Sequence, residues 1–247
     1  MIPLKSEKDL EMMRQAGKIL TKIMRRLQES VAVGMTTAEI DCFAADLIHQ
    51  EQVIPAFKGY KGYPSTICTS VNDEIVHGIP GQRKLKDGDI ISLDLGINYQ
   101  GYFSDMAVTL PLGRVKAPVK KLIDVTKKSL TEGIKVARVN NRLSDISHAI
   151  QAYVERNGFS VVRQFVGHGI GLALHEEPEV PNFGKPHQGA VLQSGMVIAI
   201  EPMVNMGSWE CSVIENGWTA VTNDGSISAH FEHTVAITNA GPEILTQ

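Results

Sequence analysis

Two segments 107 residues apart share one sequence pattern, and this duplication constrains the fold more than any other feature of the chain. The segments are "LKDGDIISLD" (85–94) and "LQSGMVIAIE" (192–201). Each has a leucine, a glycine three residues later, and an apolar run that ends in a carboxylate, Asp94 in the first and Glu201 in the second. A pattern that recurs at a fixed offset indicates two structural halves built alike. We therefore expect Asp94 and Glu201 at equivalent places.

Amphipathic periodicity predicts two pairs of helices, and the second helix of each pair recurs at an offset of 106 residues. The expected helix starts are Ser6, Thr36, Pro118 and Ser144. The expected ends that can be read are Gly34, Pro55 and Gly158. The predicted fold class is therefore α+β, with two pseudo-symmetric helix–helix–strand halves, approximately 1–115 and 116–247, around a central, mostly antiparallel sheet. The whole chain, 1–247, is predicted to be a single domain.

Composition is that of a globular protein in a reducing compartment. The chain has 247 residues, 43% hydrophobic and 21% charged, with a formal net charge of -3, which argues against nucleic acid as the primary ligand. The three cysteines, Cys42, Cys68 and Cys211, form no CxxC motif and cannot all pair. No apolar run approaches the length of a membrane span, and the N-terminus lacks the apolar core of a signal peptide. We expect a cytoplasmic protein that does not bind membranes.

The segment 89–110 predicts a β-hairpin that brings two acids together. Apolar residues alternate with polar ones through 91–97, which places Asp94 on the face opposite the apolar side chains. A turn centred between Tyr99 and Gln100 would set Asp94 directly opposite Asp105, with Cβ atoms about 4.5–5.5 Å apart. A bulge at Gly101 would shift this register. Opposed carboxylates destabilise a sheet unless a cation lies between them. From Asp94 by itself, both a solvated sheet face and a metal site remain possible environments for this side chain.

Two more acids lie at similar places in strands. Glu201 ends an apolar run before Pro202, and Glu232 shares a strand face with His230. With Asp94, Asp105 and His168 they form a set of four carboxylates and one imidazole. Two divalent ions would neutralise a charge of about -4 while bridging these groups. Oxygen-rich ligation favours Mn, Fe(II) or Co over a structural tetrahedral zinc site.

The stretch "FVGHGIGLALHEEPEV" (165–180) carries two histidines, His168 and His175, among glycines. It is not a zincin helix, because HExxH needs a histidine at position 179, which is Glu, and Pro178 would break the helix. In a strand, a separation of seven would place the two histidines on opposite faces. We therefore expect the glycines and a bend to bring both to one site.

The chain resembles the type I methionine aminopeptidases, in their short bacterial form, which belong to the pita-bread metallopeptidase family M24. The resemblance covers nearly the whole length. The matching stretches are "AFKGYKGYPSTICTSVNDEIVHGIP" (56–80), "DGDIISLDLGINYQGYFSDMAVT" (87–109), "GHGIGLALHEEPEVPN" (167–182), "GMVIAIEPM" (195–203) and "GWTAVTNDGSISAHFEHTVAIT" (217–238). It implies a pita-bread fold and a metallo-aminopeptidase that removes the initiator methionine of nascent proteins, preferring a small second residue.

The resemblance also implies the role of each site residue. The implied metal ligands are Asp94, Asp105, His168, Glu201 and Glu232, with Asp105 and Glu232 bridging two ions and a metal-bridging hydroxide as the nucleophile. His77 and His175 would contact the scissile amide, and Glu201 would also shuttle protons. The implied methionine pocket is Phe57, Tyr60, Tyr63, Cys68, Leu174 and Trp218. Some family members carry Cys at the place of Phe57 or Phe at that of Leu174, which leaves the fine shape of the pocket open.

Cofactors and partners follow from the same resemblance. We expect two divalent ions per chain, of Co, Mn, Fe(II) or Zn, and a monovalent cation near Asn72 and Ser228. The expected partners are the N-termini of nascent polypeptides, with transient association with the ribosome, and the expected oligomeric state is a monomer.

Two other classes of protein with the same fold are possible alternatives, a proline-directed peptidase and a metal-free binding protein. A prolidase or proline-directed aminopeptidase usually carries a separate N-terminal domain, whereas here the helices of the catalytic type begin by Ser6. A metal-free binding protein loses metal ligands, whereas this sequence keeps all five. A type II enzyme would carry a long insertion between His175 and Glu201 or between Glu201 and Glu232.

Overall fold

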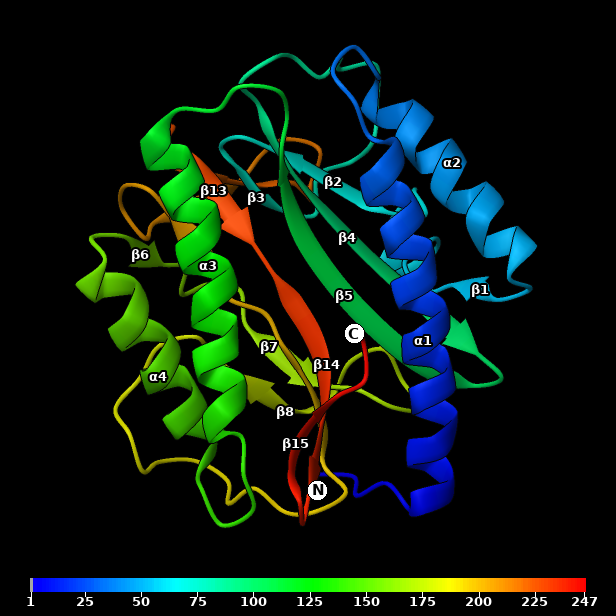
Figure 1. Ribbon diagram of the computed structural model, residues 1–247, viewed down its shortest axis with the longest axis vertical. Helices are drawn as coiled ribbons and strands as arrows, with labels where there is room; N and C mark the ends of the chain where they lie inside the picture. The colour runs from blue at the N-terminus through cyan, green and yellow to red at the C-terminus, as the bar shows by residue number, and fades with distance from the viewer. Residues whose placement is uncertain (1) are drawn as a thin grey trace.

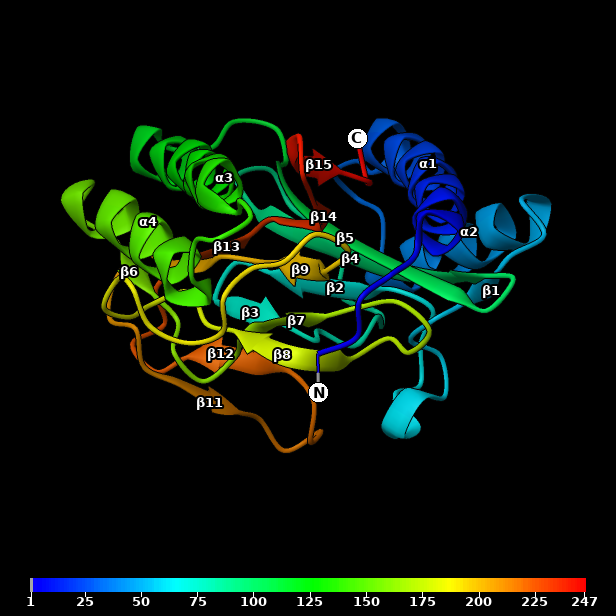
Figure 2. The ribbon, with the colours of Figure 1, turned by 90° about the horizontal axis from the view of Figure 1, so that it is seen from below.

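The computed structural model describes residues 2–247, in which four long helices cover one face of a nine-stranded sheet (Figures 1 and 2). The helices are α1 (Glu7–Ser30), α2 (Thr37–Gln50), α3 (Ala117–Val136) and α4 (Leu143–Arg156), with a short 3-10 helix η1 (Tyr60–Gly62). None of the helices described is both long enough and apolar enough to span a membrane. The strands of the first half are β1 (Ile54–Pro55), β2 (Cys68–Val71), β3 (Glu74–Val76), β4 (Ile90–Tyr99) and β5 (Tyr102–Pro111).

The second half supplies the remaining strands. They are β6 (Ser160–Val161), β7 (Gly167–Gly169), β8 (Glu176–Val180), β9 (Val197–Ile200), β10 (Met203–Asn205), β11 (Cys211–Val213), β12 (Ala220–Thr222), β13 (Ser228–His230), β14 (Glu232–Thr238) and β15 (Gly241–Ile244). Two three-stranded sheets, β13–β10–β6 and β11–β12–β3, accompany the large one. In Figure 2, β3, β11 and β12 lie on the side of the large sheet away from the helices.

The strand order of the large sheet shows the duplication directly. It runs β1–β4–β5–β14–β9–β7–β8, with β2 also paired to β4 and β15 to β14, and its pairings are antiparallel. The four central strands, β4–β5–β14–β9, are arranged symmetrically. The outer two, β4 and β9, carry the repeated sequence segments, and the inner two are β5 and β14. The predicted pseudo-symmetric α+β fold with a mostly antiparallel sheet is confirmed, and its approximate axis lies between β5 and β14.

Local signals in the two halves also match. The helices α2 and α4 each have 14 residues, and they start 106 residues apart. The glycines of the repeated segments, Gly88 and Gly195, have φ of +91° and +92°, a left-handed conformation that glycine adopts without steric cost. Gly88 ends the turn before β4, which contains Asp94, and Gly195 ends the turn before β9, which is followed by Glu201.

Capping residues explain where the helices begin. Ser6 and Thr36 cap α1 and α2 through capping boxes with Asp9 and Glu39, as the sequence predicts. Pro118 lies in the first turn of α3, where its missing N–H costs no helical hydrogen bond. The fourth helix begins at Leu143, one residue before the predicted Ser144.

Apolar side chains attach each helix pair to its own half of the sheet. Ile91, Leu93, Leu95 and Ile97 of β4 pack with α1 and α2, and residues of β9 and β14 pack with α3 and α4. The alternation along β4 therefore directs Asp94 away from the helices, as predicted. The polar side chains of β4, β5 and β14 thus gather on the face that the helices do not cover.

The hairpin β4–β5 corrects one prediction. Asp94 is paired with Ala107 and Asp105 with Gly96, so the two acids are diagonal neighbours on one face and not a directly opposed pair. The turn is centred between Gln100 and Gly101, one residue later than expected, and both have positive φ, as a two-residue type I′ turn requires. A turn shifted by one residue moves the register by two, which preserves the face and changes the partner.

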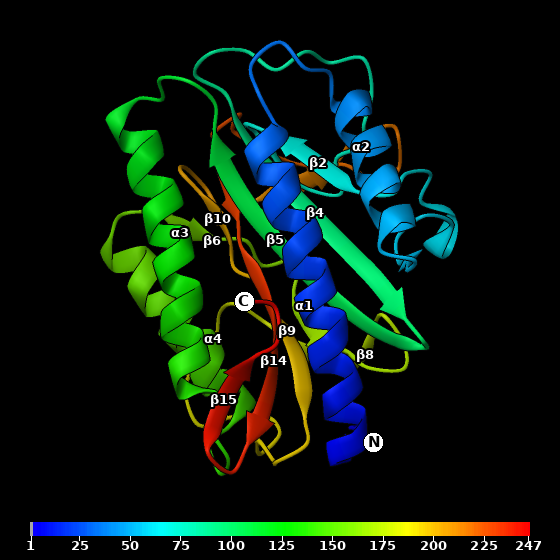
Figure 3. The same cartoon turned by 45° about the vertical axis from the view of Figure 1, so that its right-hand side comes forward.

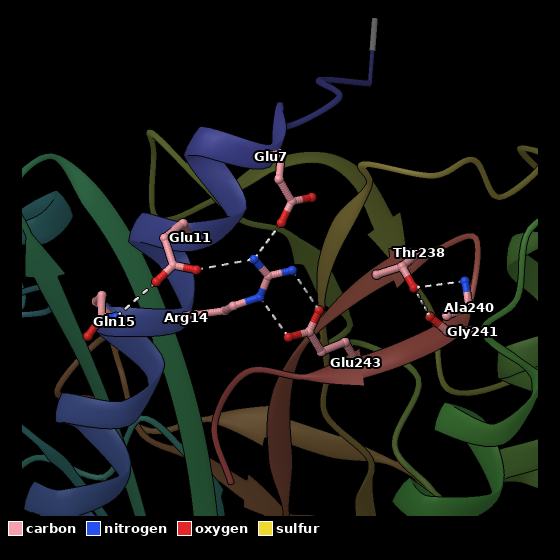
Figure 4. Close-up of polar contacts among 8 residues, drawn as sticks. All are labelled: Glu7, Glu11, Arg14, Gln15, Thr238, Ala240, Gly241 and Glu243. Atoms are coloured by element: carbon pink, nitrogen blue, oxygen red, sulfur yellow. Dashed lines mark hydrogen bonds and ion pairs between the residues drawn. The ribbon is translucent and has the colours of Figure 1, made fainter.

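The helix α1 is also attached to the C-terminal strand. Figures 1 and 3 show β15 between α1 and α3. Arg14 donates hydrogen bonds of 2.7 and 3.0 Å to the two carboxylate oxygens of Glu243 on β15, and it also contacts Glu7 and Glu11 (Figure 4). A planar guanidinium that binds both oxygens of one carboxylate fixes orientation as well as charge. The start and the end of the chain are therefore joined on the helical face.

Candidate active site

One cavity of about 170 Å³ collects the predicted site residues, which come from both halves of the chain. Its lining includes Phe57, Tyr60, Tyr63, Cys68, His77, Asp94, Asp105, His168, Leu174, His175, Glu201, Trp218 and Glu232. Every residue that the sequence analysis assigned to metal, catalysis or methionine binding is in this set.

The acids and the imidazole reach the cavity from four strands of the large sheet and from the end of a fifth element. Asp94 lies on β4, Asp105 on β5 and His168 at the centre of β7. Glu232 is the first residue of β14, and Glu201 directly follows β9. Because β4 and β9 are repeats of one another, Asp94 and Glu201 approach the cavity from equivalent places on opposite sides of the pseudo-axis.

These side chains meet the chemical requirements of a metal site. Oxygen atoms Asp94 Oδ1, Asp105 Oδ1 and Glu232 Oε1 are buried and have no hydrogen-bond partner. Ligand atoms of Asp105, His168 and Glu232 all lie within 4.8 Å of one another. A buried carboxylate oxygen without a partner is costly, and a bound cation would remove that cost. The residues present therefore fit divalent ions held mainly by oxygen.

Burial raises the pKa values of all four acids, and repulsion from neighbouring carboxylates adds to it for three of them. Burial is the main cause for Asp94, Glu201 and Glu232, whose pKa values lie well above their ordinary range, and neighbouring carboxylates add to it. Burial raises the pKa of Asp105 to about 7. Without a cation, these carboxyl groups are driven to keep protons, because several charges cannot be buried together in a medium of low polarity.

The imidazole of His168 is oriented by its own strand. Its Nδ1 is 2.9 Å from the carbonyl oxygen of Gly169, which leaves Nε2 free, 3.6 Å from Glu201 Oε1. Burial lowers the pKa of His168 to about 4, so the ring is neutral at pH 7 and able to ligate a metal. A Cβ at Gly167 would lie 2.3 Å from the carbonyl oxygen of Ala199 on β9, so the glycine allows β7 to come this close.

The two histidines of the 165–180 segment come together despite their odd separation. The register between β7 and β8 shifts at His168 and Gly169, and the loop that follows leads His175 back into the same cavity. The ring centroids of His168 and His175 are 4.2 Å apart. The expected bend near the glycines is confirmed.

Tyr60 holds His175 in place. Its hydroxyl is 2.9 Å from His175 Nδ1, and the two rings stack with centroids 5.2 Å apart. Burial, with the nearby His168 and Lys61, lowers the pKa of His175 to about 3. The imidazole is therefore neutral, and its Nε2 is not engaged by Tyr60.

The opposite wall contains His77 and aromatic rings. His77 has φ of +60°, an uncommon conformation for a residue other than glycine, and burial lowers its pKa to about 4. Its ring makes edge contacts with Phe165 and Trp218, at centroid distances of 5.5 and 6.4 Å. Trp218 in turn contacts the edge of Tyr63 at 5.1 Å. Backbone strain at a cavity residue is common in functional sites.

The sequence analysis missed two residues at this site. Lys61, in η1, also lines the cavity, and its φ of +47° follows from the tight turn between Gly59 and Gly62. His230, to which the sequence assigns no role, has its Nε2 3.6 Å from Glu201 Oε2, and neither ring nitrogen has a hydrogen-bond partner. Its position two residues before Glu232 on one strand face was the only available signal.

The residues expected near a monovalent cation are adjacent. The backbone N–H of Ser228 donates a hydrogen bond of 2.8 Å to the carbonyl oxygen of Asn72. The side-chain amide of Asn72 is already bonded to Asp89 and to the backbone of Ile90. The side-chain amide of Asn72 is therefore engaged within the protein, and the cation site stays a prediction.

A duplicated α+β fold with a buried carboxylate-rich centre in an apolar cavity defines a metal-dependent hydrolase. The chain belongs to metallopeptidase family M24, whose sequence profile matches residues 11–239. It is similar over its full length to a methionine aminopeptidase of Clostridium perfringens, with 53% identity over 246 residues, 100% of this chain and 99% of the relative. The family assignment made from the sequence is confirmed.

Solved structures agree with this assignment. The crystal structure of a methionine aminopeptidase from Thermotoga maritima shares 46% identity and superposes with a TM-score of 0.98, covering 100% of both chains. A prolidase from Pyrococcus horikoshii shares 23% identity with a TM-score of 0.79, and the match covers 99% of this chain and 63% of the prolidase. That second likeness shows the fold alone.

Proposed function

We propose that this protein is a type I methionyl aminopeptidase, a metalloenzyme that hydrolyses the peptide bond after an N-terminal methionine. One observation carries the proposal: a cluster of four carboxylates and an imidazole shares a single cavity with an apolar pocket and two neutral histidines. The relatives of similar length named methionine aminopeptidases, at 46–53% identity, support the same activity. The whole chain, 1–247, would act as one catalytic domain with halves near 1–115 and 116–247.

The metal-binding part would consist of Asp94, Asp105, His168, Glu201 and Glu232. Asp105 and Glu232, near the pseudo-axis on adjacent strands, are suited to bridge two ions of Mn, Co, Fe(II) or Zn. Divalent ions held there would lower the pKa of water and polarise the substrate carbonyl. Glu201 directly follows β9, with Oε1 3.6 Å from His168 Nε2, and a carboxylate placed there would accept a proton and pass it on.

The side chain of the substrate methionine would lie in the apolar part of the cavity. The lining there is Phe57, Tyr60, Tyr63, Cys68, Leu174 and Trp218. A flexible, polarisable thioether packs well against aromatic and aliphatic walls of this kind. The volume of about 170 Å³ is shared with the acid cluster, so the apolar part has room for about one side chain.

The peptide bond would lie between His77 and His175. Both imidazoles are neutral at pH 7, because burial lowers their pKa values to about 4 and about 3. When the Tyr60 hydroxyl donates to His175 Nδ1, the ring proton is on Nε2, from which it can donate to the substrate amide. Hydrogen-bond donors aimed at the developing charge stabilise the transition state.

The wider biological setting is proposed on the same basis. The substrates would be nascent polypeptides with a small second residue. The enzyme would act in the cytoplasm as a monomer that associates transiently with ribosomes. Neither nucleic acid nor membrane would be a primary ligand. A prolidase-like activity is the main alternative within this fold.

Parallel assays of Met-Ala-Ser and Ala-Pro-Gly, with the metal content measured in the same samples, test the proposal. We expect metal-depleted protein to be inactive, Mn, Co or Fe(II) to restore cleavage of Met-Ala-Ser, and Ala-Pro-Gly to stay intact. Asp105→Ala should lose metal binding and activity together, whereas Asp46→Ala, an exposed acid on α2, should keep both. Robust activity without metal, or preferred cleavage of Ala-Pro-Gly, would overturn the proposed function.

A further inference from the structure

A buried ion pair connects the N-terminal segment to the turn that carries His175. Lys5 Nζ pairs with Glu176 Oε2, and the two side chains are only 6% and 10% exposed. Glu176 directly follows His175 and begins β8. Removing both charges from water is costly, so a pair this deeply buried needs a structural or functional reason.

The second carboxylate oxygen of Glu176 organises the turn. Oε1 accepts hydrogen bonds from the backbone N–H groups of Leu172 and Ala173, at 2.8 and 3.2 Å. The Glu176 carboxylate therefore binds the turn through Oε1 and Lys5 through Oε2. The turn that is closed in this way carries Leu174 and His175, both of which line the cavity.

The position of Lys5 is itself fixed on two sides. Its backbone N–H donates a hydrogen bond of 2.7 Å to the carbonyl oxygen of Gly195, in the turn before β9. The next residue, Ser6, caps α1. A Cβ at Gly171 would lie 2.1 Å from Lys5 Cε, so the lysine stem occupies the space that this glycine leaves free. Lys5 thus joins the turn 171–175 to two rigid elements.

We propose that Lys5 is a positioning residue for the active site: through Glu176 it holds the turn that places Leu174 and His175 in the cavity. The role of His175 toward the substrate rests on the proposed function. The position of its ring in the cavity is a feature of the structure and does not depend on that function. Lys5 touches neither the substrate pocket nor the acids. Its loss leaves Glu176 as a buried carboxylate without a counterion, which favours opening of the turn.

The matched variants are Lys5→Met, which keeps the length of the stem, and Lys8→Met, an exposed lysine of α1. We expect Lys5→Met to lower kcat on Met-Ala-Ser by about tenfold or more, because small displacements of catalytic groups slow the chemical step strongly. The affinity for Mn, measured by calorimetry, should change by less than about twofold, because the turn contains none of the proposed ligands. Lys8→Met should match the wild-type protein in both measurements.

Two further variants separate positioning from simple stabilisation. Glu176→Gln keeps an oxygen for the N–H groups of Leu172 and Ala173, so its kcat should fall less than that of Lys5→Met. The double variant Lys5→Met with Glu176→Gln should recover part of the activity, because no carboxylate is left unpaired. Glu176→Gln also provides the test if Lys5→Met does not fold.

A readout without turnover distinguishes failure of this inference from failure of the proposed function. In zinc-loaded protein, the ring ¹⁵N resonances of His175 should shift in Lys5→Met and stay in place in Lys8→Met, whatever the substrate is. Wild-type kcat together with unchanged His175 resonances in folded Lys5→Met would overturn the proposal and leave the ion pair a purely stabilising contact. Altered resonances in an enzyme that cleaves another substrate would support the positioning and contradict the assigned activity.

Discussion

The contact between Tyr60 and His175 links η1, between β1 and β2, to the turn between β7 and β8. Tyr60 belongs to η1 in the first half, and His175 belongs to the second, so this hydrogen bond closes the cavity between the halves. The resemblance implied only a pocket role for Tyr60. Its hydroxyl instead takes part in orienting a proposed catalytic imidazole.

Tyr60→Phe should lower kcat by about fivefold, because it removes one hydrogen bond of about 1 kcal/mol and keeps the stacked ring. KM for Met-Ala-Ser should change little, since the apolar wall of the pocket is retained. The matched control is Tyr153→Phe on α4, outside the cavity, for which we expect wild-type kinetics. A rise in KM at unchanged kcat would show that the hydroxyl contributes to substrate binding and not to the orientation of His175.

At the scale of elements, close contacts between strands bring the ligands together. The short strand β7 lies between β8 and β9, and glycines on both sides of His168 let it approach them. A Cβ at Gly169 would lie 2.1 Å from the carbonyl oxygen of Glu177. The glycines on both sides of His168 are therefore needed for the close packing of β7 in the sheet.

Gly169→Ala should destabilise the protein by about 1–3 kcal/mol, because β7 must move away from β8 to admit the methyl group. The melting temperature should then fall by about 2–10 °C for a chain of this size. Gly81→Ala is the control, because a Cβ there meets no atom within 4 Å. If Gly169→Ala melted like Gly81→Ala and bound Mn normally, the spacing around β7 would not matter for the site.

At the scale of the whole molecule, the two halves are held together across a group of buried acids. Their folded pKa values are raised, so each folded carboxyl keeps a proton that the unfolded chain has released. Such a group contributes stability at low pH that is lost as the pH rises through the folded pKa, which is about 7 for Asp105. The buried histidines act in the opposite direction, losing stability as the pH falls below about 6.5.

Metal-depleted protein should therefore lose thermal stability between about pH 7 and pH 8.5, where histidines are largely neutral in both states and the acids account for most of the difference in bound protons. Protein loaded with Mn should show a weaker dependence, because the cation replaces the protons. Calorimetric melting at several pH values, with and without Mn, measures the difference. Glu232→Gln should flatten the curve of the metal-depleted protein, and a melting temperature that rises over this range would contradict the assignment of the raised pKa values.

The sequence by itself determined the duplication, the start of each helix to within one residue, and the face of β4 that carries Asp94. These features depend on periodicity, capping residues and repeated patterns, all of which act within a few residues along the chain. The full-length motifs also determined the family and the set of residues that line the cavity. The register of Asp94 and Asp105 was predicted wrongly, and two neighbours of the site, Lys61 and His230, were not predicted.

Tertiary structure alone decided which distant groups touch. The turn at Gln100 and Gly101 set the register of the hairpin, and the shift at Gly169 brought the rings of His168 and His175 within 4.2 Å. The ion pair of Lys5 with Glu176, 171 residues away, has no trace in local periodicity. A sequence pattern specifies the face on which a side chain lies, whereas its partner across space depends on turn conformations and on the packing of segments that meet only in the folded chain.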